Sequence, residues 1–215
     1  MSVDPIPDAW PPVSSSEGKP VVPLFPLAGV WLFPRAVMPL HIFEPRYRQM
    51  IEDSLDGPGR IVMGTVVEGQ EHDMSGAPPV HAVAGLGEIV RHERLPDGRF
   101  HIHLWGLGRV NVREVESDRM YRKVEIDPVI DAELGHAESE DLRSALVDAV
   151  RARSGQLLDL PDDVPVGFLA DLLVLRLQLP HALLQELYAD PDPGSRARRA
   201  LDEHARRGLE DSSED

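Results

Sequence analysis

The spacing of apolar and polar residues changes once along the chain. From residue 20 to about residue 130, short apolar runs alternate with glycine and proline, a texture typical of strands and turns. From about residue 137 onward, apolar residues recur every three or four positions, which is the period of an α-helix. Strands first and helices afterwards predict an α+β fold and argue against alternating strand–helix units with a parallel sheet.

The β half is expected to form about six antiparallel strands that close or half-close into a barrel, because closure removes exposed strand edges. One short helix is predicted over residues 44–59, with Pro45 in its first turn, where a missing N–H does no harm. Gly85 and Gly87 are expected to mark a β-bulge or a barrel corner. A further bend is expected at Gly106.

The helical half is expected to form a bundle. Ser139 and Ser195 are predicted to cap its first and last helices, because a serine hydroxyl can accept a bond from an unpaired N–H. Residues 166–179 are apolar nearly all round, which predicts a helix buried in the bundle centre.

Four parts of the chain follow from these patterns. They are a flexible leader over 1–19, a β-barrel subdomain over 20–130, a helical subdomain over 137–207 and an acidic tail over 208–215.

The charge and composition of the chain limit which partners it can bind and in which cellular compartment we expect it. The net charge is −15, and this acidic excess should repel nucleic-acid phosphate. No apolar run is long enough for a membrane-spanning helix, and the N-terminus lacks the apolar core of a secretory signal. Cysteine is absent, so we expect a cytoplasmic protein without disulfides or thiolate chemistry.

Motifs of the common hydrolases are missing. The sequence contains no phosphate-binding G-x-x-x-x-G-K-[ST] loop, no G-x-S-x-G elbow and no H-E-x-x-H pair. A Ser–Lys peptidase dyad would have to use Lys19 or Lys123, and neither sits in a context that would desolvate it. The sequence therefore predicts a protein that is not an enzyme and needs no cofactor.

Two histidines of one predicted strand are candidate ligands of a metal ion. Period two puts His101 and His103 on one face of a strand, where both imidazoles could hold a divalent ion. His81 or His92 could supply a third ligand. The same pattern is typical of the polar outer face of a barrel hairpin, and we favour that interpretation. No metal is predicted, and a metal- or small-molecule-binding barrel stays an alternative.

One long segment resembles a known family. Residues 23–55 read PLFPLAGVWLFPRAVMPLHIFEPRYRQMIEDSL, which resembles the start of the N-terminal substrate-binding domain of ATP-dependent Lon (La-type) proteases. GRIVMGTV at 59–66, GLGEIVRHERLPDGRFHIHLWGLGRV at 85–110 and the helical stretch 165–201 agree with later parts of that domain. The resemblance covers about residues 20–207.

The resemblance implies a barrel like that of PUA-type folds, followed by a small helical bundle. It also implies a role in capturing unfolded polypeptides. We expect a stand-alone form without the ATPase and peptidase domains, so those two activities are not carried over. PUA-like barrels elsewhere bind RNA, but the acidic charge of this chain argues against that ligand.

The candidate binding surface comes from a proline-rich stretch that cannot be a regular central strand. Exposed aromatic side chains there would form a binding patch, although filling the core is the competing interpretation. We predict an apolar groove with an arginine rim that binds unfolded or extended polypeptide segments. The predicted contacts are Trp31, Phe33, Arg35, Met38, Arg46 and Arg48.

A second hypothesis is a structural or oligomerisation module. In that case the chain would dock as a subunit on a separate ATPase or protease, or would form a homodimer.

Overall fold

The computed structural model describes residues 19–70, 76–154, 160–161 and 163–211. The chain divides into two compact units, Met1–Val129 and Ile130–Asp215, which are described separately. Within the described ranges, the first unit holds six strands and one helix, and the second holds four helices. The predicted α+β class is confirmed. None of the helices among the described residues has the length and apolar character to cross a membrane.

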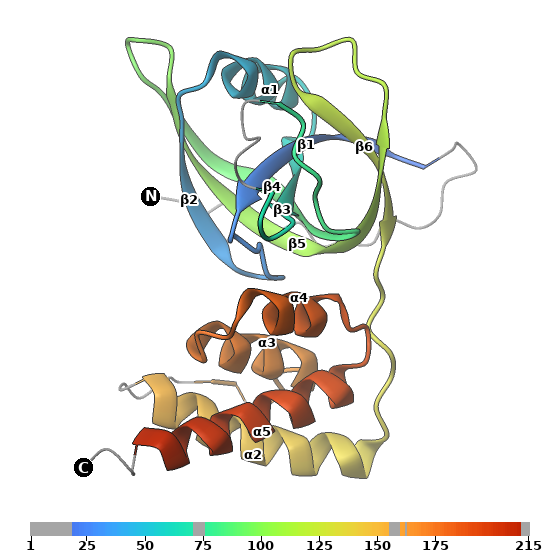
Figure 1. Cartoon of the computed structure of the whole chain (residues 1–215), viewed down its shortest axis with the longest axis vertical. Coiled ribbons are helices and arrows are strands. Elements are labelled where there is room, and N and C mark those ends of the chain that lie inside the picture. Colours follow the sequence, from blue (N-terminus) through green and yellow to red (C-terminus); the bar gives the residue numbers. More distant parts are fainter. Residues whose placement is uncertain (1–18, 71–75, 155–159, 162, 212–215) are drawn as a thin grey trace. The chain divides into compact units, whose positions relative to one another are not determined.

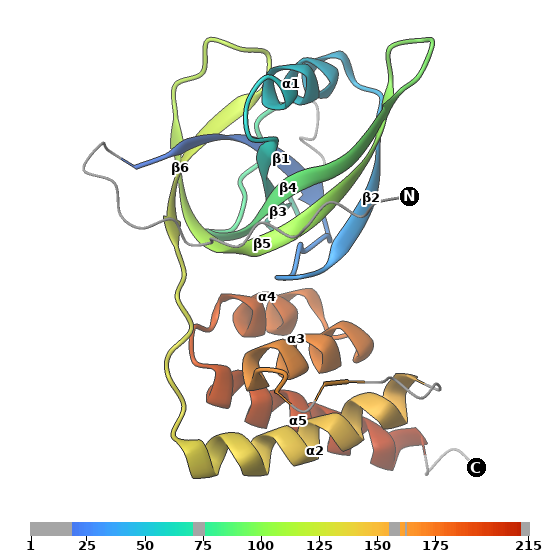
Figure 2. The same cartoon turned by 180° about the vertical axis from the view of Figure 1, so that it is seen from behind.

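The first unit is a closed sheet with one additional edge strand. Its elements are β1 (Val21–Ala28), β2 (Val37–Ile42), α1 (Pro45–Leu55), β3 (Arg60–Val66), β4 (Val83–Arg94), β5 (Phe100–Val115) and β6 (Arg122–Pro128) (Figure 1). The strand order is β2-β5-β4-β3-β1-β6, and β5 also pairs with β6. The first half of β5 pairs with β2 and its second half with β6, so five strands form a ring that Figure 2 shows from behind.

One strand pair departs from the antiparallel barrel that the sequence predicts. β1 and β3 run parallel, from the pair Leu24–Val62 to the pair Ala28–Val66. Between these strands the chain passes through β2 and α1, a crossover long enough to return it to the same end of the sheet. The other strand pairs in the described sheet are antiparallel.

The strands bury apolar side chains on both faces. One cluster lies inside the ring and consists of Val22, Leu24, Val62, Ala84, Leu86, Val110, Val124 and Ile126. A second cluster packs α1 against the sheet and includes Phe25, Ile42, Tyr47, Met50, Ile51, Ile61, Met63, Phe100 and Ile102. Burial on both faces explains why β3 is apolar almost without interruption.

Helix α1 begins at a proline and is held at its side by the end of β4 and the β4–β5 turn. Pro45 occupies the start of the helix, as predicted. The guanidinium of Arg94 forms an ion pair with Glu52 at 2.9 Å. The guanidinium of Arg48 lies against Gly98, so closely that a Cβ on Gly98 would collide with it.

Glycines in β4 and β5 mark an irregularity in strand pairing and also allow other parts of the chain to pack closely on the strands. The pairing register of β4 and β5 shifts at Leu86/Gly87, which confirms the predicted irregularity. Gly106 does not separate two strands but lies inside β5, where a Cβ would collide with the carbonyl oxygen of Phe33. Glycine at this position therefore lets the 29–36 loop lie directly on the strand.

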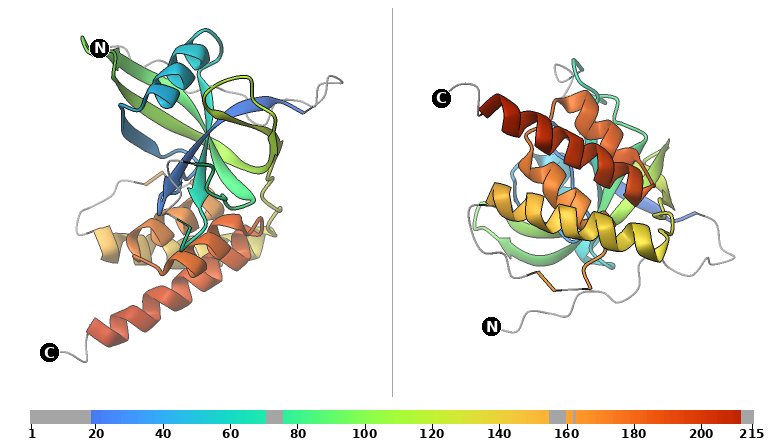
Figure 3. Two further views of the ribbon diagram at one scale, coloured as in Figure 1. Left: turned by 45° about the horizontal axis from the view of Figure 1, so that its top comes forward. Right: turned by 90° about the horizontal axis from the view of Figure 1, so that it is seen from below.

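The second unit is a bundle of four described helices. They are α2 (His136–Ser154), α3 (Val166–Arg176), α4 (His181–Ala189) and α5 (Pro193–Asp211), shown from two sides in Figure 3. α3 contacts each of the other three helices, and most of its side chains are buried. The predicted central helix is therefore confirmed, although it ends at Arg176 and not at residue 179.

Both predicted serine caps are wrong. Ser139 lies inside α2, which begins at His136. The last helix begins at Pro193, and the Asp192 carboxylate accepts hydrogen bonds from the backbone N–H of Gly194 at 2.8 Å and from that of the next residue at 3.1 Å. An aspartate followed by proline in the first turn combines two favourable N-terminal signals, which explains the earlier start.

The two chain ends were predicted to be a flexible leader and a mobile acidic tail. Residues 1–18 of the predicted leader lie outside the described residues, and Lys19 pairs with Asp127 at 2.8 Å. α5 extends to Asp211, so the first residues of the predicted tail are helical.

Candidate functional site

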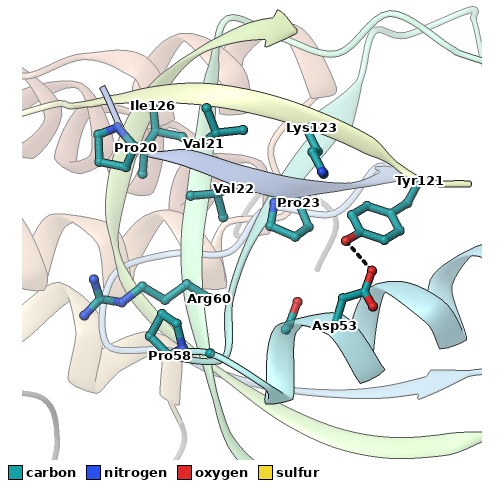
Figure 4. A pocket seen from close by; sticks show the side chains of 12 residues that line it. Pro20, Val21, Val22, Pro23, Asp53, Pro58, Arg60, Tyr121, Lys123 and Ile126 are labelled. Carbon is teal, nitrogen blue, oxygen red and sulfur yellow. Dashed lines mark hydrogen bonds between the residues drawn. The ribbon is translucent and has the colours of Figure 1, made fainter. Parts of the chain in front are cut away.

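A hollow of about 460 Å³ opens in the wall of the barrel unit (Figure 4). It lies where the start of β1 separates from β3, because the β1–β3 pairing begins only at Leu24. Residues 21–23 pair with β6 alone among the described strands. The lining residues are Pro20, Val21, Val22, Pro23, Asp53, Ser54, Gly57, Pro58, Arg60, Tyr121, Lys123 and Ile126.

The floor and walls of the hollow are mainly apolar. Val22 and Ile126 are buried beneath it, whereas Val21 is 52% exposed. Three prolines line the walls, at positions 20, 23 and 58. A proline has a fixed φ and no N–H, so these walls are stiff and present few backbone donors. The volume falls in the range of about 300–1,000 Å³ that is usual for preformed binding pockets.

A tyrosine–aspartate pair forms one side of the rim. The Tyr121 hydroxyl donates a hydrogen bond to the Asp53 carboxylate at 2.8 Å, and Figure 4 shows the two side chains facing each other. Burial, together with this bond to the carboxylate, raises the pKa of Tyr121 from 10.0 to about 12. The hydroxyl therefore stays protonated and keeps the loop before β6 attached to α1.

The cationic side chains of the rim are already paired. Lys123 donates to Asp118 at 2.7 Å, and this bond lowers the pKa of the Asp118 carboxyl. Arg60 forms an ion pair with Glu88 at 3.2 Å. Because the nearby charges compensate each other, the hollow is better suited to an apolar group than to a charged ligand.

The rim lacks the arrangement of a hydrolytic site among the described residues. Ser54 is the one serine or threonine that lines the hollow, and its hydroxyl donates to the carbonyl oxygen of Met50 at 2.7 Å. A nucleophilic serine needs a neighbouring base to take its proton, and this bond points the hydroxyl at its own helix instead.

Four of the contacts predicted from the sequence lie elsewhere in the barrel unit. Phe33 is only 2% exposed, since its loop lies directly on Gly106. Trp31 and Met38 are half-buried, and Met38 packs against the barrel core. Arg35 is exposed and has a positive φ of 63°. None of these four residues lines the hollow.

The two predicted rim arginines of α1 have structural neighbours. Arg46 pairs with Glu44 at 3.0 Å, and its guanidinium lies 4.5 Å from the centre of the Tyr47 ring. Arg48 packs against Gly98. The sequence pattern did not reveal the hollow because its walls come from three separate segments, and the prolines at 20, 23 and 58 were the one local signal of it.

His101 and His103 lie on one face of β5, as predicted, but His101 has a neighbour that the sequence did not predict. His101 is exposed and His103 is half-buried, while the intervening Ile102 is buried. Among the described residues, no three metal-ligating side chains are grouped to hold an ion. The His101 ring lies beside that of His41 of β2, with 5.0 Å between the two ring centres.

The family model described as the ATP-dependent protease La (LON) substrate-binding domain matches residues 21–205. The chain belongs to this family. The matched domain is a substrate-binding domain, and no catalytic domain is matched.

Full-length Lon proteases are among the relatives in sequence. "Lon protease 2" of Sorangium cellulosum is 29% identical over 161 residues, which cover 71% of this chain and 20% of that protein. A "Lon protease" of Xanthomonas oryzae is 28% identical over 190 residues, which cover 88% of this chain and 20% of that protein. The chain thus spans about a fifth of the length of these Lon proteases.

Solved structures of Lon N-terminal domains share the fold. The N-terminal domain of a Mycobacterium avium complex Lon protease aligns with a TM-score of 0.65 at 17% identity, covering 86% of this chain and 98% of that one. A Lon N-terminal domain protein from Xanthomonas campestris aligns with a TM-score of 0.61 at 24% identity, covering 85% and 97%.

Proposed function

We propose that this member of the Lon substrate-binding domain family binds exposed apolar segments of polypeptides without catalysing a reaction. The observation that carries the proposal is the preformed hollow beside Val21, with its apolar floor and its paired rim charges. It would receive one large aliphatic or aromatic side chain of the bound segment.

The backbone beside the hollow supports an extended partner. Residues 21–23 use one edge to pair with β6, and no described strand pairs with their other edge. An extended segment lying there could form main-chain hydrogen bonds while its side chain enters the hollow. Pro23 cannot donate such a bond, so the pairing would be short and the bound segment would exchange readily.

The expected affinity is modest. Burying one leucine- or phenylalanine-sized side chain contributes about 1.5–3 kcal/mol. A dissociation constant of about 1 μM corresponds to about 8 kcal/mol. One hollow therefore cannot supply micromolar binding alone, and tight capture would need several contacts along one unfolded chain.

A matched pair of valines tests the location. Val21 lines the hollow and is 52% exposed, whereas Val37 on β2 is 51% exposed and does not line it. Both substitutions to aspartate should leave the fold intact, because neither side chain is part of the core. In a titration with fluorescently labelled, permanently unfolded casein, we expect Val21→Asp to weaken binding about tenfold. Val37→Asp should bind like the original chain.

Other outcomes are equally informative. Weakening by Val37→Asp alone would move the site to β2, near the predicted contacts Arg35 and Met38. Absence of saturable binding to unfolded casein would reject polypeptide binding. Cleavage of casein, or turnover of ATP, by the purified chain would reject the non-catalytic part of the proposal.

A further inference from the structure

Two imidazoles from neighbouring strands meet on the outer face of the barrel unit. His41 of β2 stands opposite His101 of β5 in the pairing register. Both side chains are exposed, their ring centres are 5.0 Å apart, and their planes cross at 64°. Neither residue lines the hollow beside Val21.

The hydrogen-bond pattern places this pair where two strands bring side chains closest. The backbone N–H of Gly106 donates to the carbonyl oxygen of Ala36 at 2.8 Å, which makes Ala36 and Gly106 a hydrogen-bonded pair. Counting along the register in steps of two, the odd-numbered residues of β2 form the non-hydrogen-bonded pairs. The Cβ atoms of His41 and His101 are therefore about 4.5–5.5 Å apart.

This spacing suits a metal ion held between two rings. A Zn²⁺ ion lies about 2.0–2.1 Å from each imidazole nitrogen, so one ion bridges two rings whose centres are this close after small side-chain rotations. The residues also border a second hollow of about 410 Å³, which leaves room for coordinated water. Phe43 lies next to His41, with 5.8 Å between ring centres.

The protein would supply two of the metal's ligands, because the neighbouring polar side chains lie in other positions. Glu93 stands opposite His101 on β4, on the side away from His41. His103 stands opposite Pro39, one row further along the same face. Within the described ranges no group of three ligands is already gathered around one point. Water would complete the coordination, as in an exposed and exchangeable site.

We propose that His41 and His101 form a two-imidazole site for a divalent transition-metal ion. Nitrogen ligands favour Cu²⁺, Ni²⁺ and Zn²⁺ over Mg²⁺ and Ca²⁺, which prefer oxygen. Such an ion would cross-link β2 to β5. Because β2 pairs with no other described strand, the bound metal would stabilise the edge of the sheet, and more so as its concentration rises above the dissociation constant.

The test uses the whole chain without an affinity tag and Cu²⁺ as the first probe. Paramagnetic Cu²⁺ should erase the NMR signals around His41, His101 and Phe43 before any others. Zn²⁺ should raise the melting temperature. Each of His41→Ala and His101→Ala should weaken metal binding more than about tenfold, because each removes a direct ligand.

His92→Ala is the matched control. His92 borders the same hollow but stands opposite Ile102 in the register. This variant should bind Cu²⁺ and Zn²⁺ like the original chain. Signal loss centred on another histidine, or unchanged binding in His41→Ala, would overturn the proposal. His41→Phe, which keeps a ring against His101, separates loss of a ligand from loss of cross-strand packing.

Discussion

The guanidinium of Arg196 on α5 holds the carboxylate of Asp131 with two hydrogen bonds, of 3.1 and 2.7 Å. Arg196 is fully buried, and it also forms an ion pair with the buried Asp171 of α3 at 3.3 Å. Burial alone would lower the pKa of Arg196, but the bond to Asp131 and the charges of both aspartates outweigh burial and raise that pKa. One cation thus joins α3, α5 and the segment before α2.

Removing this cation should destabilise the helical unit strongly. Arg196→Met leaves Asp171 buried without its positive partner, and such a loss costs about 3 kcal/mol or more. Arg198→Met is the matched control, since Arg198 lies on the same helix and pairs with Glu138 at an exposed position. Its effect should stay within about 1 kcal/mol. Urea unfolding followed by helical circular dichroism measures both, and equal losses would contradict a special role for Arg196.

Gly106→Ala should destabilise the barrel unit. The added Cβ would collide with the carbonyl oxygen of Phe33, and a backbone atom cannot swing aside as a flexible side chain would. Overpacking of this kind costs about 1–3 kcal/mol. Gly57→Ala adds the same methyl group in the same unit at an ordinary contact distance, 3.8 Å from the carbonyl oxygen of Ser54, so its effect should stay within about 0.5 kcal/mol. Thermal unfolding of both variants checks the prediction, which fails if they melt together.

Burial of Tyr121, together with its bond to Asp53, should make the stability of the barrel unit sensitive to alkaline pH. The pKa of Tyr121 is about 12 in the folded chain, against 10.0 for an ordinary tyrosine. Between these values the folded state keeps a proton that the unfolded state has released, so the free energy of unfolding falls as pH rises. The contribution is fully present below about pH 10.

Tyr121→Phe isolates this contribution. The variant lacks the titrating hydroxyl, so the difference in unfolding free energy between it and the original chain should shrink as pH rises from 10 to 12. Urea midpoints measured across this range provide the comparison. A constant difference would show that Tyr121 titrates alike in both states.

Gln178 occupies a backbone conformation that favours glycine. It follows the last residues of α3 with a φ of 47°, as a residue does when a helix ends in a left-handed turn. Gln178→Gly should therefore raise the unfolding free energy by up to about 1 kcal/mol. Gln178→Ala keeps the Cβ and should give no such gain. A lower melting temperature for the glycine variant would contradict this account.

Local patterns predicted a large part of the fold. The start of α1 at Pro45, the irregularity at Gly87 and the buried central helix α3 all follow from patterns within one element. The caps failed where two local signals competed, because the sequence shows serine as a possible cap but not that Asp192 starts the helix earlier. Local periodicity shows which face of a helix or strand is apolar, but it does not show which other element packs against that face.

The candidate sites were less predictable for the same reason. The sequence placed Phe33 in a possible exposed patch, yet the loop that carries it lies on Gly106 and buries it. The hollow beside Val21 exists because β1 leaves β3 at its first residues, which is a property of strand pairing. The pair His41–His101 likewise depends on the register between two strands that are distant in the chain.

By itself the sequence determined the order of strands and helices, the alternation of buried and exposed positions and the resemblance to a substrate-binding domain. Only the tertiary structure decided the parallel pairing of β1 with β3, the burial of Arg196 and the position of the hollow. The physical reason is the distance along the chain over which each interaction acts. Backbone geometry and side-chain periodicity act between neighbours, whereas pairing register and the burial of a charge are fixed only when remote segments pack together.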